Sequence, residues 1–312
     1  MNTSAPLELV RKAVHRQIIG QDKLIDRLLL ALLCNGHVLL EGAPGLAKTK
    51  LVKALTAACG GTMQRVQFTP DLLPSDVIGT EIFRPEKGEF VLRKGPVFTN
   101  FLLGDEINRA PAKVQSALLQ AMEERFVTIG HHTYELPKPF FVLATQNPLE
   151  QEGTYPLPEA QLDRFLMKLD VLYPSFDEEL SIVRQYGTSG QDIAIDPATS
   201  IDEIQSMQRS AGELYIDERL DRFIVTLVQR TREPEKISGF IQGASPRASI
   251  ALRKLAKAHA FLAGRTFVGP DDIKEVYLDV MRHRVIPSYS NETQGRRSDT
   301  ILAEQLTATQ IP

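Results

Sequence analysis

The sequence predicts an α/β protein in which a parallel β-sheet lies between layers of helices and is followed by a smaller all-helical domain. Strand-like and helix-like segments alternate up to about residue 173, which is typical of a parallel sheet covered on both faces. After Tyr173-Pro174-Ser175 the apolar spacing is helical. The 312 residues suffice for two domains. We therefore place the α/β domain at 1–174 and the helical domain at 175–312.

The first strand and the first sheet helix are joined by a loop that contains glycine. The apolar run Val38-Leu39-Leu40 precedes the loop, and apolar residues on one helical face follow it, namely Leu51, Val52, Leu55 and Ala58. The loop thus ends at a helix N-terminus, where free N–H groups and the helix dipole favour an anion. An ordinary turn before a helix is the alternative. We expect a phosphate-binding loop formed by Glu41, Gly42, Ala43, Pro44, Gly45, Leu46, Ala47, Lys48 and Thr49, with Lys50 beside it.

The residue types in this loop suit a nucleoside triphosphate. Gly42 and Gly45 allow the backbone to approach phosphate oxygens closely. Lys48 supplies a positive charge for the β- and γ-phosphates, and the Thr49 hydroxyl can bind Mg²⁺. Ala47 occupies a position that usually carries glycine. Alanine tolerates a helical turn but not a positive φ, so the match to the usual loop is incomplete on this argument.

Two further strands end in polar residues that suit the same chemistry. Residues 101–104 are apolar and lead into Asp105 and Glu106, which can both reach the phosphates from the carboxyl end of a parallel strand. We expect Asp105 to hold Mg²⁺ through water and Glu106 to polarise the attacking water. Residues 140–145 lead into Asn147, whose amide could hydrogen-bond the γ-phosphate or the water. A solvated Asp-Glu pair is the simpler alternative.

An Asp-Arg pair precedes the last predicted strand, residues 166–171. Asp163 and Arg164 could form a local salt bridge, which would contribute little near the surface. Alternatively, Arg164 could be an arginine finger that acts on the nucleotide of a neighbouring subunit. The spacing of the two residues leaves both interpretations open.

Further elements are predicted by turn residues and apolar spacing. Residues 65–68 form a strand, and Pro111 opens a helix. Two segments near 80–96 and 126–137 each contain short apolar runs around a glycine turn, which predicts β-hairpins. In the second domain one helix has a clear apolar stripe, formed by Leu220, Phe223, Ile224, Leu227 and Val228.

A later helix carries a candidate site residue. Ser245 caps this helix, with Pro246 at its first position, and Gly264 ends it, while Pro270 starts the next helix. Arg247 lies in the first turn, where the helix dipole disfavours a cation. A phosphate across a domain interface would explain it, and a surface arginine is the alternative.

The chain beyond Ser288 is weakly patterned. We expect either a short helix near 301–306 or a mobile end there.

Composition limits the class of protein. Hydrophobic residues make up 43% and charged residues 24% of the chain, as in ordinary globular proteins. The net charge of −3 gives no electrostatic case for nucleic acid as the main partner. Residues 28–34 are the longest apolar run and are too short to span a bilayer. Cys34 and Cys59 are expected to be free buried thiols, and no leader precedes the domain, so we expect a cytoplasmic protein.

Together these motifs resemble an AAA+ ATPase of the MoxR family, in the helix-2-insert clade. The resemblance spans roughly residues 7–290, and the matching motifs are residues 41–49, 68–76, 105–113, 144–148, 162–165 and 245–247. The family carries alanine at the position of Ala47. The fold implied is a P-loop NTPase core with a parallel αβα sheet and a smaller all-α lid, and the ligands implied are ATP and Mg²⁺.

The resemblance also implies roles for single residues. Asn147 is sensor 1, Arg164 the finger that acts in trans, and Arg247 sensor 2. Ile19 and Gly20 lie in a segment that packs on adenine, although a hydrophobic helix cap explains each residue equally well. The hairpins are the helix-2 insert and the pre-sensor-1 hairpin, which in a ring face the pore or a client. Hairpins that only cover an edge are the alternative.

The activity implied is ATP hydrolysis that drives chaperone-like remodelling, maturation or activation of partner complexes. The protein is expected to form a ring, most simply a hexamer, and such partners often carry a von Willebrand factor A domain. Neither nucleic acid binding nor membrane insertion is expected. Two alternatives are the motor subunit of a metal-chelatase-like complex and a nucleotide-switched binding module with little hydrolysis. The motif from Asp105 to Pro111 argues against the first, and the joint presence of Glu106, Asn147 and Arg164 argues against the second.

Overall fold

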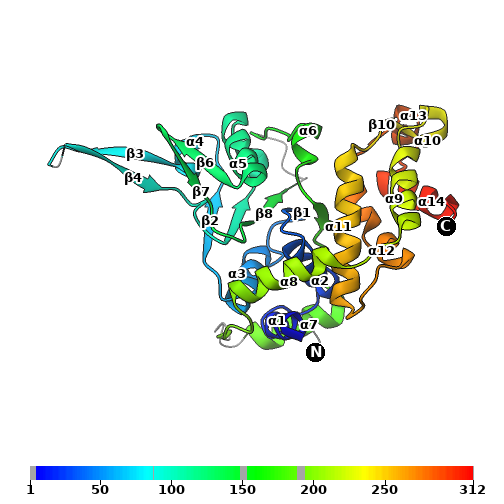
Figure 1. Ribbon diagram of the computed structural model, residues 1–312, viewed down its shortest axis with the longest axis horizontal. Helices are drawn as coiled ribbons and strands as arrows, with labels where there is room; N and C mark the ends of the chain where they lie inside the picture. The colour runs from blue at the N-terminus through cyan, green and yellow to red at the C-terminus, as the bar shows by residue number, and fades with distance from the viewer. Residues whose placement is uncertain (1–4, 87, 148–152, 188–193, 312) are drawn as a thin grey trace. The chain divides into compact units, whose positions relative to one another are not determined.

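A computed structural model describes residues 5–86, 88–147, 153–187 and 194–311 of the chain. These residues form two compact units (Figure 1). The sheet unit comprises residues 5–157 and 169–205, and the lid unit comprises residues 158–168 and 206–311.

The division differs from the boundary that we predicted at residue 174. Residues beyond that point pack back on the sheet unit, since Tyr186 Oη donates to Gln17 O at 2.7 Å and Ala198 N donates to Ala58 O at 2.8 Å. Residues 158–168 instead join the lid unit, where they contact residues more than 80 positions later in the chain.

A five-stranded sheet with strand order β2-β5-β8-β1-β9 organises the sheet unit. Its strands are β1 (Val38–Glu41), β2 (Met63–Gln67), β5 (Phe101–Asp105), β8 (Phe141–Gln146) and β9 (Met167–Asp170). The pairings of β2 with β5, β5 with β8, and β8 with β1 are parallel, as predicted. Their register places Gln67 opposite Asp105 and Leu40 opposite Thr145, so the carboxyl ends of these strands meet at one edge.

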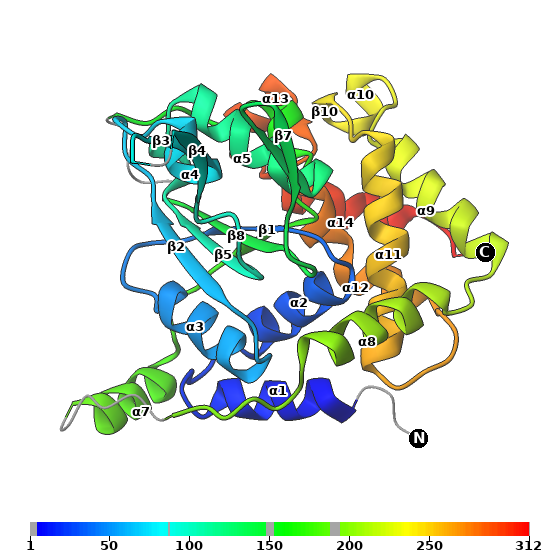
Figure 2. The same cartoon turned by 60° about the vertical axis from the view of Figure 1, so that its left-hand side comes forward.

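Helices cover both faces of this sheet. Helices α1 (Ala5–His15), α2 (Asp22–Leu33) and α3 (Lys48–Ala58) lie on one side, and α5 (Ala112–Glu124) lies on the other (Figures 1 and 2). The apolar stripe predicted for α3 is buried, and so are the side chains of Val114, Leu118 and Met122 in α5. Shorter elements are the helix α4 (Pro74–Ile78) and the 3-10 turn η1 (Ile107–Arg109). Helix α7 (Phe176–Tyr186) completes the unit.

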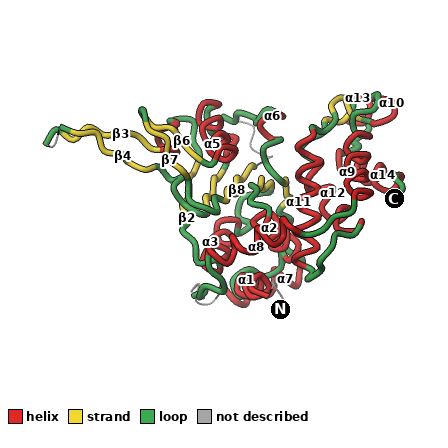
Figure 3. The backbone as a smooth tube through the Cα atoms, viewed as in Figure 1, coloured by secondary structure: helices red, strands yellow, loops and turns green. Residues whose placement is uncertain are grey.

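Both predicted hairpins are confirmed. β3 (Gly79–Arg84) pairs with β4 (Glu89–Lys94), and β6 (Phe126–Ile129) pairs with β7 (His132–Glu135), each antiparallel. The β3–β4 ribbon extends away from the five-stranded sheet, and Figure 3 shows it as a two-stranded arm.

The lid unit is mainly helical. It contains α6 (Glu159–Leu162), α9 (Glu218–Arg230), α10 (Glu235–Ser238), α11 (Pro246–Leu262), α12 (Pro270–Met281), α13 (Tyr289–Thr293) and α14 (Ser298–Ala308), while α8 (Ile201–Glu213) runs from one unit into the other. A short antiparallel ribbon of β10 (Phe240–Gln242) and β11 (Ile286–Pro287) accompanies the helices. The predicted stripe on α9 is buried.

Local signals in the lid unit are largely confirmed. Ser245 caps α11 by accepting a hydrogen bond from Arg247 N, and Gly264 follows the helix with φ 71. The chain near 301–306 is helical, with Ile301 and Leu302 buried, so the helical alternative for this segment was correct.

The two cysteines differ in burial. Cys59 is buried, and burial raises the pKa of its thiol to about 12, whereas Cys34 is only half-buried. The prediction that both thiols are buried therefore holds for Cys59 alone. No helix among the described residues has the length and apolar character needed to cross a lipid bilayer.

Candidate active site

The loop between β1 and α3 has the backbone of a phosphate-binding loop. Gly45 has φ 84 and Ala47 has φ 53, and α3 begins at Lys48. Left-handed residues in such a turn gather successive N–H groups into a concavity that suits an anion. The argument that alanine would not take a positive φ here is thus wrong. Its cost, roughly 1–2 kcal/mol, is borne by the surrounding fold.

A pocket of about 410 Å³ lies against this loop. Its walls come from the loop with the start of α3, and from the carboxyl ends of β2, β5 and β8. The lining residues are Pro44, Gly45, Leu46, Ala47, Lys48, Thr49, Lys50, Arg65, Gln67, Asp105, Glu106, Thr145 and Asn147. The pocket thus brings together most of the residues that the sequence assigned to the nucleotide.

Asp105 is held on both oxygens. Arg65 Nε donates to Oδ2 at 2.6 Å, and Thr145 Oγ1 donates to Oδ1 at 3.3 Å. The Asp105 side chain is only 11% exposed, while the Arg65 side chain is 51% exposed. The carboxylate therefore forms a fixed part of the pocket wall, and its arginine partner lies on the solvent side.

Glu106 follows the end of β5 in a left-handed conformation, with φ 58. Its backbone N donates to Thr145 Oγ1 at 2.9 Å. Its Oε2 accepts hydrogen bonds from Gln67 Nε2 at 2.7 Å and from Arg109 Nη1 at 3.2 Å. Thr145 therefore links the Asp105 carboxylate and the Glu106 backbone to β8, while Gln67 and Arg109 orient the Glu106 carboxylate.

Four of these contacting residues were not assigned a role from the sequence: Arg65, Gln67, Arg109 and Thr145. A usable signal exists for β2, because residues two apart on a strand point to the same side. Arg65 and Gln67 share one side of β2, and the strand order places β2 beside β5. The sequence shows that Arg65 and Gln67 alternate with an apolar residue, but it does not show that β5 is the strand beside them.

Lys48 and Thr49, at the start of α3, line the same pocket. Lys48 Nζ donates to Gly42 O at 2.7 Å. Burial lowers the pKa of Lys48, and the nearby Asp105 and Glu106 act in the opposite direction. A hydroxyl and a carboxylate are the oxygen ligands that Mg²⁺ prefers, and Thr49 and Asp105 supply them within one pocket. The residues present thus fit Mg²⁺ together with a polyphosphate.

Gly42 has a packing role that the sequence did not reveal. A Cβ at this position would lie 2.8 Å from Val171 O, so only glycine fits between the loop and the chain after β9. Gly42 and Ala43 do not line the described pocket, whereas Gly45 does.

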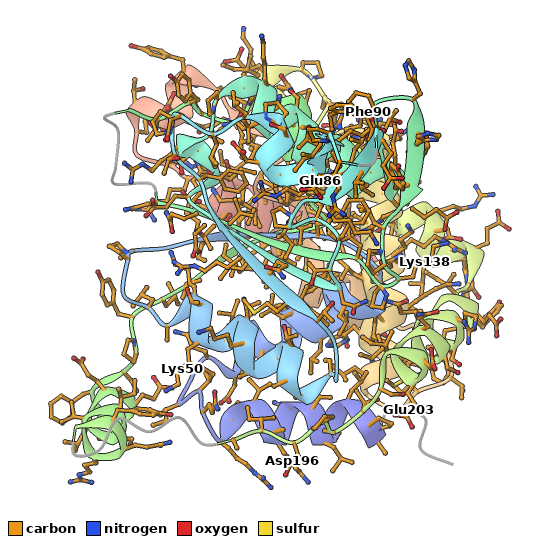
Figure 4. All side chains as sticks on the ribbon, turned by 90° about the vertical axis from the view of Figure 1, so that its left-hand side faces the viewer. Lys50, Glu86, Phe90, Lys138, Asp196 and Glu203 are labelled. Carbon is orange, nitrogen blue, oxygen red and sulfur yellow. The ribbon has the colours of Figure 1, made fainter. Side chains whose placement is uncertain are left out.

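The segment predicted to pack on adenine lies beside α7. Gly20 has φ 70, and a Cβ there would meet the carboxylate of Glu178 at 2.5 Å. Gln21 Nε2 donates to Leu172 O at 2.8 Å. Lys50 Nζ lies 3.5 Å from the centre of the Tyr186 ring, which places the start of α3 beside α7 (Figure 4). Ile19 and Gly20 are not among the lining residues of the pocket, so contact with adenine stays a prediction.

The remaining candidates, Arg164 and Arg247, belong to the lid unit. Their neighbour Asp163 accepts hydrogen bonds from Ser245 Oγ at 2.7 Å and from Arg284 Nε at 2.8 Å. Burial lowers the pKa of Arg284 to about 10, although Asp163 opposes the shift. Asp163 therefore has a buried structural partner other than the adjacent Arg164.

Comparison with known proteins gives consistent matches. A family model described as "ATPase family associated with various cellular activities (AAA)" matches residues 37–167, and an AAA lid domain model matches residues 240–305. Chaperone MoxR1 of Mycobacterium tuberculosis is 49% identical over 282 residues, which cover 88% of this chain and 74% of that protein. Protein MoxR of Paracoccus denitrificans is 32% identical over 308 residues, which cover 89% of this chain and 88% of that protein. The crystal structure of a "putative ATPase" from Cytophaga hutchinsonii superposes with a TM-score of 0.93 at 45% identity, covering 99% of this chain and 96% of that chain.

Proposed function

This chain belongs to the MoxR family of AAA+ ATPases, and from that premise we propose that it hydrolyses Mg²⁺-bound ATP in order to remodel, mature or activate partner protein complexes. The observation that carries the proposal is the convergence of Lys48, Thr49, Asp105 and Glu106 on one pocket. A site that only binds phosphate does not need Glu106, the residue suited to activating water.

Each side chain in the pocket has a separate proposed role in hydrolysis. The loop N–H groups and Lys48 bind the phosphates. Thr49 and Asp105 would hold Mg²⁺, which supplies charge neutralisation at the phosphates when it is bound. Glu106, oriented by Gln67 and Arg109, accepts a proton from the attacking water.

Asn147 in the pocket and two arginines of the lid unit complete the proposed mechanism. The amide of Asn147 is proposed to orient the γ-phosphate or the water, and Arg247 to contact the phosphates. Arg164 is proposed to act on the nucleotide of a neighbouring subunit, which requires a ring, and a hexamer is the simplest such ring for this family. We place this activity in the cytoplasm.

The hairpins supply a candidate surface for the client. Phe83 and Phe90 lie on facing strands of the β3–β4 arm with ring centroids 5.1 Å apart, and both side chains are exposed. An exposed aromatic pair supports client contact over simple covering of an edge. A protein client with a von Willebrand factor A domain remains the proposed partner.

Two pocket variants test the ATPase. Lys48→Ala should weaken ATP binding, because it removes a positive charge from the site of a multiply negative ligand. Glu106→Gln should retain ATP and lose about 10²–10⁴-fold in turnover, because only water activation is removed. Binding is measured with a fluorescent nucleotide and turnover by phosphate release. Wild-type turnover in Glu106→Gln would show that Glu106 is not the base.

The client is tested with the same variant. Proteins that co-purify with Glu106→Gln in ATP, but not with Lys48→Ala, are candidate clients. Replacing Phe83 and Phe90 with serine in the Glu106→Gln background should abolish their capture while ATP binding persists. Capture that survives this change would exclude the β3–β4 arm as the contact surface.

A further inference from the structure

The geometry around Asp105 leads us to propose that Arg65 competes with Mg²⁺ for this carboxylate and thereby limits how much the metal strengthens nucleotide binding. The inference rests on the proposed binding of Mg²⁺-ATP in the same pocket. Nothing in the motifs of the chain marks Arg65, which lies on a neighbouring strand, 40 positions before Asp105.

The first step is the contact itself. Arg65 Nε lies 2.6 Å from Asp105 Oδ2, a short hydrogen bond between two charged groups. The carboxylate is largely buried, and its second oxygen accepts from the Thr145 hydroxyl. Because water screens a buried carboxylate poorly, the positive charge of Arg65 offsets much of the negative charge that Asp105 would offer to a metal ion.

The second step is that the guanidinium is held in place. Arg65 Nη2 donates to Gln67 Oε1 at 3.2 Å, and Gln67 Nε2 donates to Glu106 Oε2 at 2.7 Å. The Gln67 amide is thus oriented with its oxygen toward Arg65 and its nitrogen toward Glu106. Arg65 is therefore built into the carboxylate network of the pocket.

The third step concerns where Arg65 can go. Its side chain is half exposed and lines the same pocket as the phosphate-binding loop. When a divalent cation takes its place beside Asp105, the guanidinium stays within the pocket, where phosphate oxygens are suitable partners for it. Arg65 should therefore favour nucleotide without metal and oppose the additional gain that metal brings.

A measurable ratio follows from this. The metal gain is the dissociation constant of a fluorescent, non-hydrolysable ATP analogue in EDTA divided by its value in saturating MgCl₂. Arg65→Gln should raise the metal gain on the order of tenfold, since one positive charge near the metal is removed. Arg65→Lys, which keeps the charge, should stay closer to the wild-type value. Arg84→Gln on the β3–β4 arm changes the net charge equally and should leave the ratio unchanged.

The opposite result has a clear meaning. If Arg65 instead orients Asp105 for the metal, Arg65→Gln will lower the metal gain, and a fall or no change overturns the proposal. Because competition for Asp105 requires both side chains, Arg65→Gln should change the ratio less in an Asp105→Asn background than in the wild-type background. This double-mutant cycle tests whether Arg65 acts through Asp105 even if Arg65→Gln alone is less stable. Thermal melting of each variant monitors folding.

The outcome also separates this inference from the proposed function. A wild-type chain that binds no nucleotide in either condition would overturn both. A wild-type chain whose nucleotide binding responds to Mg²⁺, together with an Arg65→Gln variant of unchanged metal gain, would overturn only the role of Arg65.

Discussion

Two pairs of arginine-bound carboxylates, one pair in each unit, differ in what surrounds them. Asp105 and Glu106 in the sheet unit face a pocket, and their arginine partners are 51% and 40% exposed. Asp163 in the lid unit is bound to Arg284, which is 3% exposed. The Asp272 side chain, also in the lid unit, is fully buried against His259 and Arg265, although Arg265 itself is 37% exposed.

The difference shows when an ion pair can be exchanged for a ligand. An arginine that reaches a carboxylate from solvent can return to water when it leaves, so its departure costs less than that of a buried arginine. An arginine buried with its carboxylate cannot leave without stranding a charge, which costs about 3–5 kcal/mol. The arginine partners in the sheet unit are therefore open to exchange with a ligand, whereas the buried Arg284 in the lid unit is not.

Arg164 tests this comparison most severely, because it is a lid-unit arginine with a proposed catalytic role. As a finger it should contribute about 10³–10⁵-fold to the rate while leaving the ATP affinity of its own subunit nearly unchanged. Arg164→Ala keeps an intact pocket and Lys48→Ala keeps an intact finger. Mixing these two inactive variants should restore part of the ATPase activity, measured by phosphate release.

The mixing experiment needs evidence that subunits exchange. A fluorescent label on one variant monitors exchange, and recovery should be partial because many interfaces still lack one component. Mixed assemblies that exchange fully yet stay inactive would argue against action in trans. Melting curves of Arg164→Ala would then show whether the residue is mainly structural.

Breaking the buried pair of Asp163 and Arg284 in the lid unit should lower the stability of the fold. Asp163→Asn leaves the Arg284 guanidinium without its counter-charge, so the free energy of unfolding should fall by about 3 kcal/mol. Urea denaturation followed by circular dichroism measures this. Glu218→Gln, which breaks the exposed pair with Arg222, is the matched control and should cost less than about 0.5 kcal/mol. Equal losses in the two variants would contradict the contrast between buried and exposed pairs.

Asp272 predicts a smaller effect that depends on pH. Burial alone would raise the pKa of Asp272, but hydrogen bonds from His259, Arg265 and Gly269 N outweigh burial and hold the pKa at about 2, below its ordinary value of 3.8. A lowered carboxyl pKa stabilises the fold above the unfolded pKa, and this contribution is lost as the pH falls through the folded value. About 2 kcal/mol should therefore disappear between pH 4 and pH 2.

Unfolding by urea at a series of pH values isolates this contribution. Asp272→Asn should lose stability at neutral pH and show a shallower decline below pH 4 than the wild type. Asp271→Asn changes the adjacent residue, whose side chain is 92% exposed, and should retain the wild-type profile. A wild-type profile in Asp272→Asn would assign the acid sensitivity to other groups.

The sequence predicted what depends on neighbours along the chain. The loop at 41–49, the two carboxylates at the end of β5 and the caps of α11 are local signals, and each lies where it was expected. Contacts between strands could not be predicted from the sequence, because the partners of Arg65 depend on the order of strands in the sheet. Asp163 shows the same limit, since its partner Arg284 lies 121 positions later in the chain.

The domain boundary shows a different limit. The sequence predicted a helical pattern after Ser175, and α7 does begin at Phe176. No local signal says which unit a helix will join. Residues 169–205 join the sheet unit because of side-chain and backbone contacts to segments far away in sequence.

The left-handed backbone at Ala47 makes the loop depend on the rest of the fold. A glycine takes this conformation without strain, whereas a Cβ disfavours it, so Ala47 is held against its local preference. Contacts elsewhere in the folded protein must offset this cost. The shape of the loop is therefore a property of the whole fold, and a peptide with the sequence of residues 41–49 should not hold this turn by itself.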